Sequence, residues 1–359
     1  MPRFITPKKI PPKIGGGSFR AVGRLLGFVG VLVVIGLIYG FLELLQYGQK
    51  FTAPETESRE ILVTIPPGAT YPQIAKLLRE NGAIRDEEAF LWAIRLNSRL
   101  KRPVSIKAGE QALDPSLSVW EVIKLLVKGN FKFYPFTIPE GLNMAEIARS
   151  VERAGLGSAQ DFWALCHDRN FISSLGIGAD TLEGYLFPET YNFPKGTPLK
   201  DVAQAMTKQF FEVWGKYSQE AAAQGLDLNQ VLTMASIVEK ETGAPTERPL
   251  IAAVFFNRLE KKMRLQTDPT VIYGIPNFNG NLTRADLANP HPYNTYVIDG
   301  LPPGPIANPG EDSIKAVLNP AKSRYLYFVS KNDGTHHFSE TLREHNRMVA
   351  QYQRGGGSS

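Results

Sequence analysis

VTIPPGATYPQIAKLLRENG, residues 63–82, is followed 73 positions later by a second copy, FTIPEGLNMAEIARSVERAG, residues 136–155. Seven of the twenty paired positions are identical. Each copy opens with a short β-prone run, passes through proline and glycine into apolar residues at helical spacing, and ends on a glycine suited to a helix C-terminus. The repeat therefore predicts two strand–turn–helix units and a fold of the α+β class.

Helix-start signals support this interpretation. In a capping box, a Ser, Thr or Asn side chain and a Glu or Gln three residues later bond each other's backbone N–H groups. That spacing occurs at Thr70–Gln73, Ser118–Glu121 and Asn143–Glu146. Gly129 closes the helix that starts after Ser118, and the β-prone run FKFY follows at residues 131–134. A further helix and strand are thus expected between the two copies.

The second half of the chain is predicted to be mostly helical, with a β-hairpin near its end. Apolar spacing predicts helices over residues 200–224, 227–242, 247–262 and 311–318. YLYFVS (325–330) and HHFS (336–339) flank Asn332-Asp-Gly334, a typical hairpin turn. We expect one mixed α/β domain over residues 136–350 and a flexible tail over 351–359.

A membrane anchor is predicted near the N-terminus. Residues 25–42, LLGFVGVLVVIGLIYGFL, carry no charge, and 18 helical residues span roughly 27 Å, close to the bilayer's hydrocarbon core of about 30 Å. Six basic and no acidic residues precede this run, and basic flanks stay in the cytoplasm. We expect a single-pass helix over residues 25–47, a cytoplasmic tail over 1–24, and all later residues outside.

Two alternatives to the anchor fit the sequence less well. A cleaved signal peptide usually has a shorter apolar region and an A-x-A-like site, and ELLQYGQKFTA (43–53) offers none. A buried core helix normally keeps a polar face, which this run lacks. The polar stretch 48–60 is predicted to be a linker, leading into a small module over residues 61–135.

Charge and cysteine content exclude several classes of function. The chain has 40 basic and 35 acidic residues, but six of the basic ones lie in residues 1–42, which leaves 34 against 35 for the body. Because the rest of the chain has a net charge close to zero, its charge does not indicate a nucleic-acid-binding surface. The single cysteine, Cys166, excludes an intrachain disulfide, and we expect it to be buried. The histidines have no metal-ligand spacing, so neither a metal nor a cofactor is indicated.

Two glutamates are the first candidates for acid chemistry. Glu239 and Glu241 end the predicted helix LNQVLTMASIVEKETG, residues 228–243. At about 100° per residue, they fall about 80° to either side of Val231 on the apolar face. Partial burial raises a carboxyl pKa, as a general acid near neutral pH requires. Periodicity does not choose between the two, and two solvated flank residues remain the alternative.

Several motifs occur in a fixed order along the chain. They are LEGYLFPETYNFP (182–194), MASIVEKETG (234–243), VFFNRLEKKMRLQTDPTVIYG (254–274), PYNTY (292–296) and GLPPGPIANPG (300–310). This succession closely resembles the endolytic murein transglycosylases, the MltG or YceG-like family, over essentially residues 20–350. In that family the catalytic acid is the first Glu of the S-I-V-E-K-E-T run, which corresponds to Glu239. The resemblance therefore favours Glu239 over Glu241.

The resemblance implies cleavage of the β-1,4 bond between N-acetylmuramic acid and N-acetylglucosamine in peptidoglycan. Glu239 would protonate the leaving oxygen and then take the proton of the muramyl C6 hydroxyl, which attacks C1 and closes a 1,6-anhydro ring. Most glycosidases need a second carboxylate for water or for a covalent intermediate. A lytic enzyme needs one, because its nucleophile is part of the substrate.

Further residues are expected to line a sugar cleft. Asp268 is the candidate second carboxylate, with a helix N-cap before Pro269 as the alternative, and Gln266 is a candidate hydrogen-bond donor to an acetamido or hydroxyl group. The remaining substrate-binding candidates are Tyr293, Asn294, Tyr296 and Glu183, with Tyr185 beside Glu183. Aromatic residues at such places also serve packing.

The resemblance implies a cellular setting as well. The module 61–135 resembles glycan-binding LysM domains, with a scaffold that binds no ligand as the alternative. The expected place is the inner, cytoplasmic membrane, with peptidoglycan strands as substrate and peptidoglycan synthases as partners. Two other functions stay open. One is a non-enzymatic peptidoglycan-binding scaffold, and the other is a hydrolytic muramidase that uses Glu239 and Asp268 with water.

Overall fold

The structure, a computed structural model, describes residues 27–40, 60–100 and 104–354. The chain divides into two compact units, Met1–Lys132 and Phe133–Ser359. Residues 27–40 form a helix with every side chain exposed. None of the helices in the described ranges is both long enough and apolar enough to cross a bilayer. The predicted tail 1–24, most of the linker 48–60 and the rest of the predicted anchor lie outside the described residues.

The first unit is a strand–helix–helix–strand–helix module. Its elements are β1 (Ile61–Ile65), α2 (Tyr71–Glu80), α3 (Glu87–Leu100), β2 (Gly109–Leu113) and α4 (Val119–Lys128). Strands β1 and β2 are antiparallel, with Val63 opposite Gln111. Helices α2, α3 and α4 contribute the buried side chains of Leu78, Phe90 and Leu126 to one apolar core. The first repeat copy thus becomes a strand and the helix that packs near it.

The second copy opens the second unit in the same way. It supplies β3 (Phe133–Thr137) and α5 (Met144–Arg153), which are followed by α6 (Ala159–Leu165), α7 (Arg169–Ser174) and β4 (Thr190–Pro194). Strands β3 and β4 are antiparallel, with Phe136 opposite Tyr191. The domain boundary predicted at residue 135 falls inside β3. Cys166 is buried and free, as expected.

The local signals read from the sequence act as predicted. The pairs Ser118–Glu121 and Asn143–Glu146 form complete capping boxes at α4 and α5. The C-terminal glycine of each repeat copy, Gly82 and Gly155, has a positive φ, 75° and 69°. A positive φ costs glycine little, so these positions end the helices cleanly.

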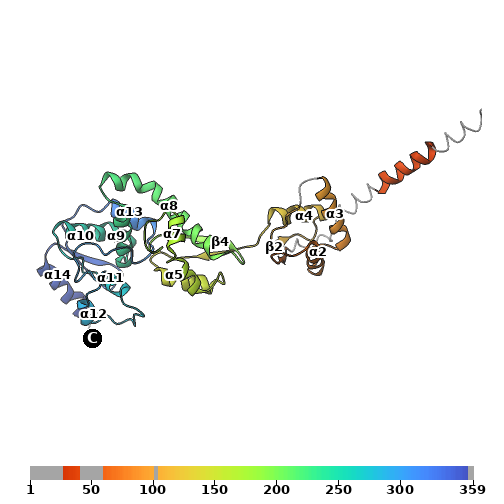
Figure 1. Cartoon of the computed structure of the whole chain (residues 1–359). Coiled ribbons are helices and arrows are strands. Elements are labelled where there is room, and N and C mark those ends of the chain that lie inside the picture. The colour runs from red at the N-terminus through yellow and green to blue at the C-terminus, as the bar shows by residue number, and fades with distance from the viewer. Residues whose placement is uncertain (1–26, 41–59, 101–103, 355–359) are drawn as a thin grey trace, which may run out of the picture. The chain divides into compact units, whose positions relative to one another are not determined.

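The larger part of the second unit is helical. It contains α8 (Leu199–Ala223), α9 (Leu228–Glu241), η1 (Pro245–Glu247), α10 (Arg248–Glu260), α11 (Asp268–Tyr273), α12 (Arg284–Ala288) and α13 (Glu311–Leu318). Helix α9 packs against α8, α10, α11 and α13, and Figure 1 shows it among them. All eight side chains from Val231 to Val238 are therefore buried, which leaves the C-terminal turn of α9 to reach the surface.

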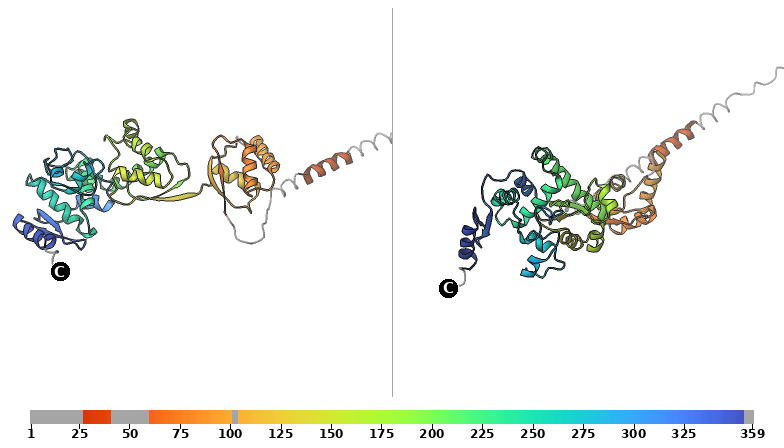
Figure 2. Two further views of the ribbon diagram at one scale, coloured as in Figure 1. Left: turned by 90° about the horizontal axis from the view of Figure 1, so that it is seen from below. Right: turned by 60° about the vertical axis from the view of Figure 1, so that its left-hand side comes forward.

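The chain ends in a hairpin and a helix at the edge of the second unit. Strands β5 (Tyr327–Ser330) and β6 (His336–Ser339) are antiparallel, and α14 (Leu342–Val349) and the short π-helix η2 (Ala350–Arg354) follow. Figure 2 shows these elements, in dark blue, as an outer layer of the unit. The fold is mixed α+β, mostly helical, with small two-stranded sheets. The predicted α+β class and the closing hairpin are confirmed.

Candidate active site

The two glutamates at the end of α9 lie in different surroundings. They are two residues apart, so their side chains leave the helix in directions about 200° apart. On one side, α10 and α13 pack against α9. On the other side lie α11 and the C-terminal layer, which is formed by β5, β6, α14 and η2. Each carboxylate is consequently defined by neighbours that are distant in the sequence.

Glu239 is held in a buried ion pair. Arg248 donates from Nη2 to its Oε1 at 3.1 Å, and only 7% of the Glu239 side chain and 10% of the Arg248 side chain are exposed. The other oxygen, Oε2, accepts from the Ser313 hydroxyl at 2.7 Å and from the Gly310 backbone N–H at 3.1 Å. All these partners are donors to the carboxylate. Glu239 therefore links α9 to α10 and α13, and the proton-donor role expected for it stays a prediction.

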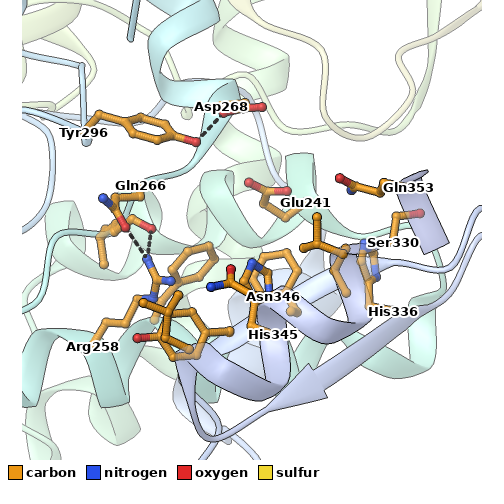
Figure 3. Close-up of a pocket in the computed structure, with 17 residues that line it drawn as sticks. Glu241, Arg258, Gln266, Asp268, Tyr296, Ser330, His336, His345, Asn346 and Gln353 are labelled. Carbon is orange, nitrogen blue, oxygen red and sulfur yellow. Dashed lines mark hydrogen bonds between the residues drawn. The ribbon is translucent and has the colours of Figure 1, made fainter. Parts of the chain in front are cut away.

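Glu241 lines an open pocket of about 560 Å³, a volume suited to a small ligand. One wall comes from α9, α10 and the loop before α11, and the other comes from the C-terminal layer. Figure 3 shows Glu241 between these walls. The lining residues are Glu241, Phe255, Arg258, Leu265, Gln266, Asp268, Tyr296, Tyr327, Phe328, Val329, Ser330, His336, Leu342, His345, Asn346, Val349 and Gln353.

The surroundings of Glu241 favour its protonated form. Burial raises the pKa of the Glu241 carboxyl above its usual range, and the negative charge of Asp268 acts in the same direction. The hydrogen bond donated by the Thr267 hydroxyl and the charge of His336 oppose this rise in pKa without cancelling it. A carboxyl that keeps its proton closer to neutral pH can serve as a general acid.

Three of the predicted binding residues lie in this pocket. Gln266 adopts a positive φ of 50° and accepts a hydrogen bond from Arg258 Nη1 at 3.4 Å. Asp268 accepts a hydrogen bond of 2.6 Å from the Tyr296 hydroxyl, which Figure 3 shows as a dashed line. The N-cap of α11 is Thr267 and not Asp268. The Asp268 side chain instead lines the pocket, with Tyr296 as its hydrogen-bond partner.

The other predicted binding residues are not among those that line the pocket. Glu183 is buried and accepts hydrogen bonds from the Met144 backbone N–H and from Asn308 Nδ2, each at 3.0 Å. Burial raises its pKa to about 7. Asn294 is buried too, and its amide donates to the backbone carbonyls of residues 286, 287 and 289. Tyr293 packs on Tyr273, with ring centroids 4.8 Å apart. These residues support the fold around the site.

Sequence reasoning missed the contribution of the C-terminal layer. His336, His345 and Asn346 line the pocket, although the spacing of the histidines in the sequence indicates no site. Among the described residues no group of three or more His, Cys, Asp or Glu side chains could hold a metal ion. The one available signal was the alternation in HHFS, which places His336 and Phe338 on the same face of a strand.

Comparisons with known proteins agree with the motifs. A sequence model described as the YceG-like family matches residues 63–351. A Bacillus subtilis protein named endolytic murein transglycosylase is 35% identical over 324 residues, which cover 85% of this chain and 89% of that protein. A Streptococcus pneumoniae protein of the same name is 30% identical, over 81% of this chain and 58% of its own length.

A solved structure is also similar. The crystal structure of a yceG-like protein from Listeria monocytogenes matches with a TM-score of 0.58 and 33% sequence identity. The match covers 81% of this chain and 99% of the Listeria chain. It extends the sequence similarity to the three-dimensional fold.

Proposed function

We propose that this chain, which belongs to the YceG-like family, is a lytic transglycosylase that cuts peptidoglycan strands internally. Its substrate would be the β-1,4 bond between N-acetylmuramic acid and N-acetylglucosamine. The products would end in 1,6-anhydro-N-acetylmuramic acid, and cutting nascent strands would limit their length.

The observation that carries this proposal is the placement of Glu241. It is a partly buried carboxyl with a raised pKa, in a pocket that also holds Gln266, Asp268 and Tyr296. Amide, carboxylate and phenol groups are suited to the hydroxyl and acetamido groups of a sugar. We therefore propose Glu241 as the acid, and Glu239, to which the family motif points, stays the alternative.

The reaction begins with proton donation. Glu241 gives its proton to the oxygen of the departing N-acetylglucosamine as positive charge develops at C1 of the muramyl sugar. The C6 hydroxyl of the same sugar then bonds to C1, which requires a base to accept its proton. Tethering of this hydroxyl to the reacting ring can supply an effective molarity of about 10⁵ M or more. The hydroxyl therefore outcompetes water.

The cellular setting is part of the proposal. The exposed apolar helix over residues 27–40, together with the basic residues before it, supports a membrane anchor with a cytoplasmic N-terminus. The pocket would then face the cell wall outside the cytoplasmic membrane. Peptidoglycan synthases would be natural partners, since they release the strands that this enzyme would cut. The β–α–α–β order of the first unit supports a LysM-like, glycan-binding role.

Mass spectrometry of digestion products tests the reaction type. The detergent-solubilised full chain is incubated with uncrosslinked glycan strands, and the new ends are identified. Anhydro ends are about 18 Da lighter than hydrolytic ends, because no water is added. Anhydro ends on fragments of intermediate length are expected early in the digestion. A complete absence of cleavage would instead favour a non-enzymatic peptidoglycan-binding scaffold.

One observation favours a second candidate, the hydrolytic muramidase. Asp268 lies in the same pocket as Glu241, and a pair of carboxylates is the usual equipment of a glycosidase. The Tyr296 hydroxyl, however, already donates to Asp268, which gives this carboxylate a binding role. Reducing muramic acid ends as the main product, lost in both Glu241→Gln and Asp268→Asn, would establish the muramidase.

A further inference from the structure

The two walls of the pocket differ in chemistry. The wall that carries Glu241 also contributes Gln266 and the Asp268 carboxylate. The opposite wall, the C-terminal layer, has no carboxylate, lysine or arginine among its described lining residues. Figure 3 shows its Ser330 and Gln353 at the end of the pocket away from Gln266. The aliphatic and neutral polar members of this wall are Val329, Ser330, Leu342, Asn346, Val349 and Gln353.

Helix α14 turns an uncharged face to the pocket. Leu342, Asn346 and Val349 all line it, and their spacing of four and then three residues places them on one side of the helix. The two arginines of α14, Arg343 and Arg347, are exposed and do not line the pocket. The helix therefore keeps its positive charges away from a ligand and offers it amide and aliphatic groups.

The cationic groups that do border the pocket are already engaged. Arg258 is the only lysine or arginine among the described lining residues, and it is 8% exposed. Its Nε and Nη1 groups donate to backbone carbonyls at 2.7 and 2.8 Å. Burial and the positive charge of Arg258 lower the pKa of His345, so this imidazole is neutral at pH 7. Nδ1 of His336 lies 2.8 Å from the Glu247 carboxylate. An anionic ligand would find no exposed cation here.

A muramyl sugar occurs in two forms that differ in charge. Its O3 carries a lactyl group, whose carboxyl is joined through an amide to a peptide stem. In a strand stripped of its stems, that carboxyl is free and ionised at neutral pH. The Asp268 carboxylate would repel it, and burial of an unpaired carboxylate is costly. The amide groups of a stem, by contrast, donate and accept hydrogen bonds, as do the side chains of Asn346 and Gln353.

We propose that the wall formed by the C-terminal layer is a subsite for the peptide stem, so that the enzyme prefers strands with stems over stripped strands. The subsite rests on the lytic function proposed above and holds whichever glutamate of α9 is the acid. Asn346 and Gln353 pair with the peptide groups of the stem. Leu342, which is 54% exposed, packs against the lactyl methyl group. Acidic groups further along the stem stay in solvent, because the pocket is open.

The test compares kcat/KM of the detergent-solubilised full chain on three uncrosslinked substrates of equal strand length. They are strands with stems, strands stripped by an amidase that cleaves the lactyl–peptide bond, and stripped strands whose carboxyls are converted to methylamides. Strands with stems should be favoured over stripped strands at least about tenfold, mostly through KM, because a contact between like charges weakens binding. Methylamide strands should lie between the two, since they lack both the charge and the peptide.

Asn346→Lys tests the wall directly. The new ammonium group would attract the free carboxylate, so the preference for strands with stems should fall about threefold or more. Gln351→Lys is the matched control, because Gln351 is exposed on the same layer and does not line the pocket. It should leave the preference unchanged. The ratio of kcat/KM for two substrates does not depend on the fraction of folded protein, so a loss of stability cannot imitate the expected result.

The outcomes separate the subsite from the lytic function. Stripped strands that the wild type cuts within about threefold of strands with stems would overturn the subsite. So would methylamide strands that are cut no better than stripped ones, or a preference that Asn346→Lys leaves unchanged or that both lysine variants change equally. Isothermal titration calorimetry measures binding of the same strands without turnover. A binding preference for stems without any cleavage would refute the lytic function and support the subsite, and equal binding without cleavage would refute both.

Discussion

Exchanging each glutamate of α9 for glutamine discriminates between the two carboxylates. Glu241→Gln keeps the size of the side chain and an acceptor for the Thr267 hydroxyl, but it removes the proton donor. General acid catalysis is worth about 10²–10⁴-fold, so kcat should fall by that factor. Because burial already disfavours the ionised form of Glu241, the neutral glutamine should not lower the melting temperature.

Glu239→Gln should show the opposite pattern. The amide oxygen can still accept from Ser313. Arg248, however, loses its buried ion pair with residue 239 and keeps the ion pair with Glu140 at 3.2 Å. A hydrogen bond to a charged group contributes about 1.5–3 kcal/mol. At roughly 2–4 °C per kcal/mol for a unit of this size, the melting temperature should fall by about 3–12 °C. The kcat should stay within about tenfold of wild type.

Two measurements on the same preparations decide the matter. The release of anhydro-ended fragments gives the rate, and differential scanning calorimetry gives the melting temperature. An inactive Glu239→Gln with a wild-type melting temperature, together with an active Glu241→Gln, would refute the reasoning. It would restore the assignment of Glu239 that the motif alone suggested.

Three further variants and a truncation extend these tests. Asp268→Asn should raise KM about 3–10-fold, as expected for one lost charged contact, and anhydro ends should persist; reducing ends instead would point to hydrolysis. Burial raises the pKa of Glu183 in the folded protein to about 7, above its unfolded value, so the free energy of unfolding should decrease by about 3 kcal/mol as the pH rises from about 4.5 to 7. Urea titrations of Glu183→Gln should show a smaller decrease over the same pH range. Gly243→Ala should displace the hairpin, because the new methyl would meet the Gly334 carbonyl, and lower kcat at least about tenfold with the fold retained by circular dichroism. Deleting residues 1–47 should move the protein from the membrane to the soluble fraction on carbonate extraction, and a truncated protein that stays with the membrane would contradict the anchor.

The local structure of this protein could be predicted from its sequence. Helix starts such as Asn143–Glu146 and glycine ends such as Gly82 depend on groups a few residues apart, and they appear in the structure as predicted. The same holds for the boundaries of α8, α9, α10 and α13 and for the hairpin β5–β6. The ordered motifs were sufficient to identify the family. The sequence also brought forward Gln266, Asp268 and Tyr296 as binding candidates, together with Tyr293, Asn294 and Glu183, which do not line the pocket.

Local sequence patterns could not distinguish the roles of Glu239 and Glu241. On the helical wheel the two are mirror images about the apolar face, so periodicity gives them equal weight. What separates them is the identity of the groups that pack on each side: Arg248 and Ser313 enclose Glu239, whereas Thr267 and the pocket border Glu241. Likewise, Glu247 and His336 are 89 residues apart and meet only because the hairpin packs against the end of α9. Burial and charge compensation depend on long-range packing, and for that reason the tertiary structure alone decided which carboxylate faces the pocket and which histidine lies beside it.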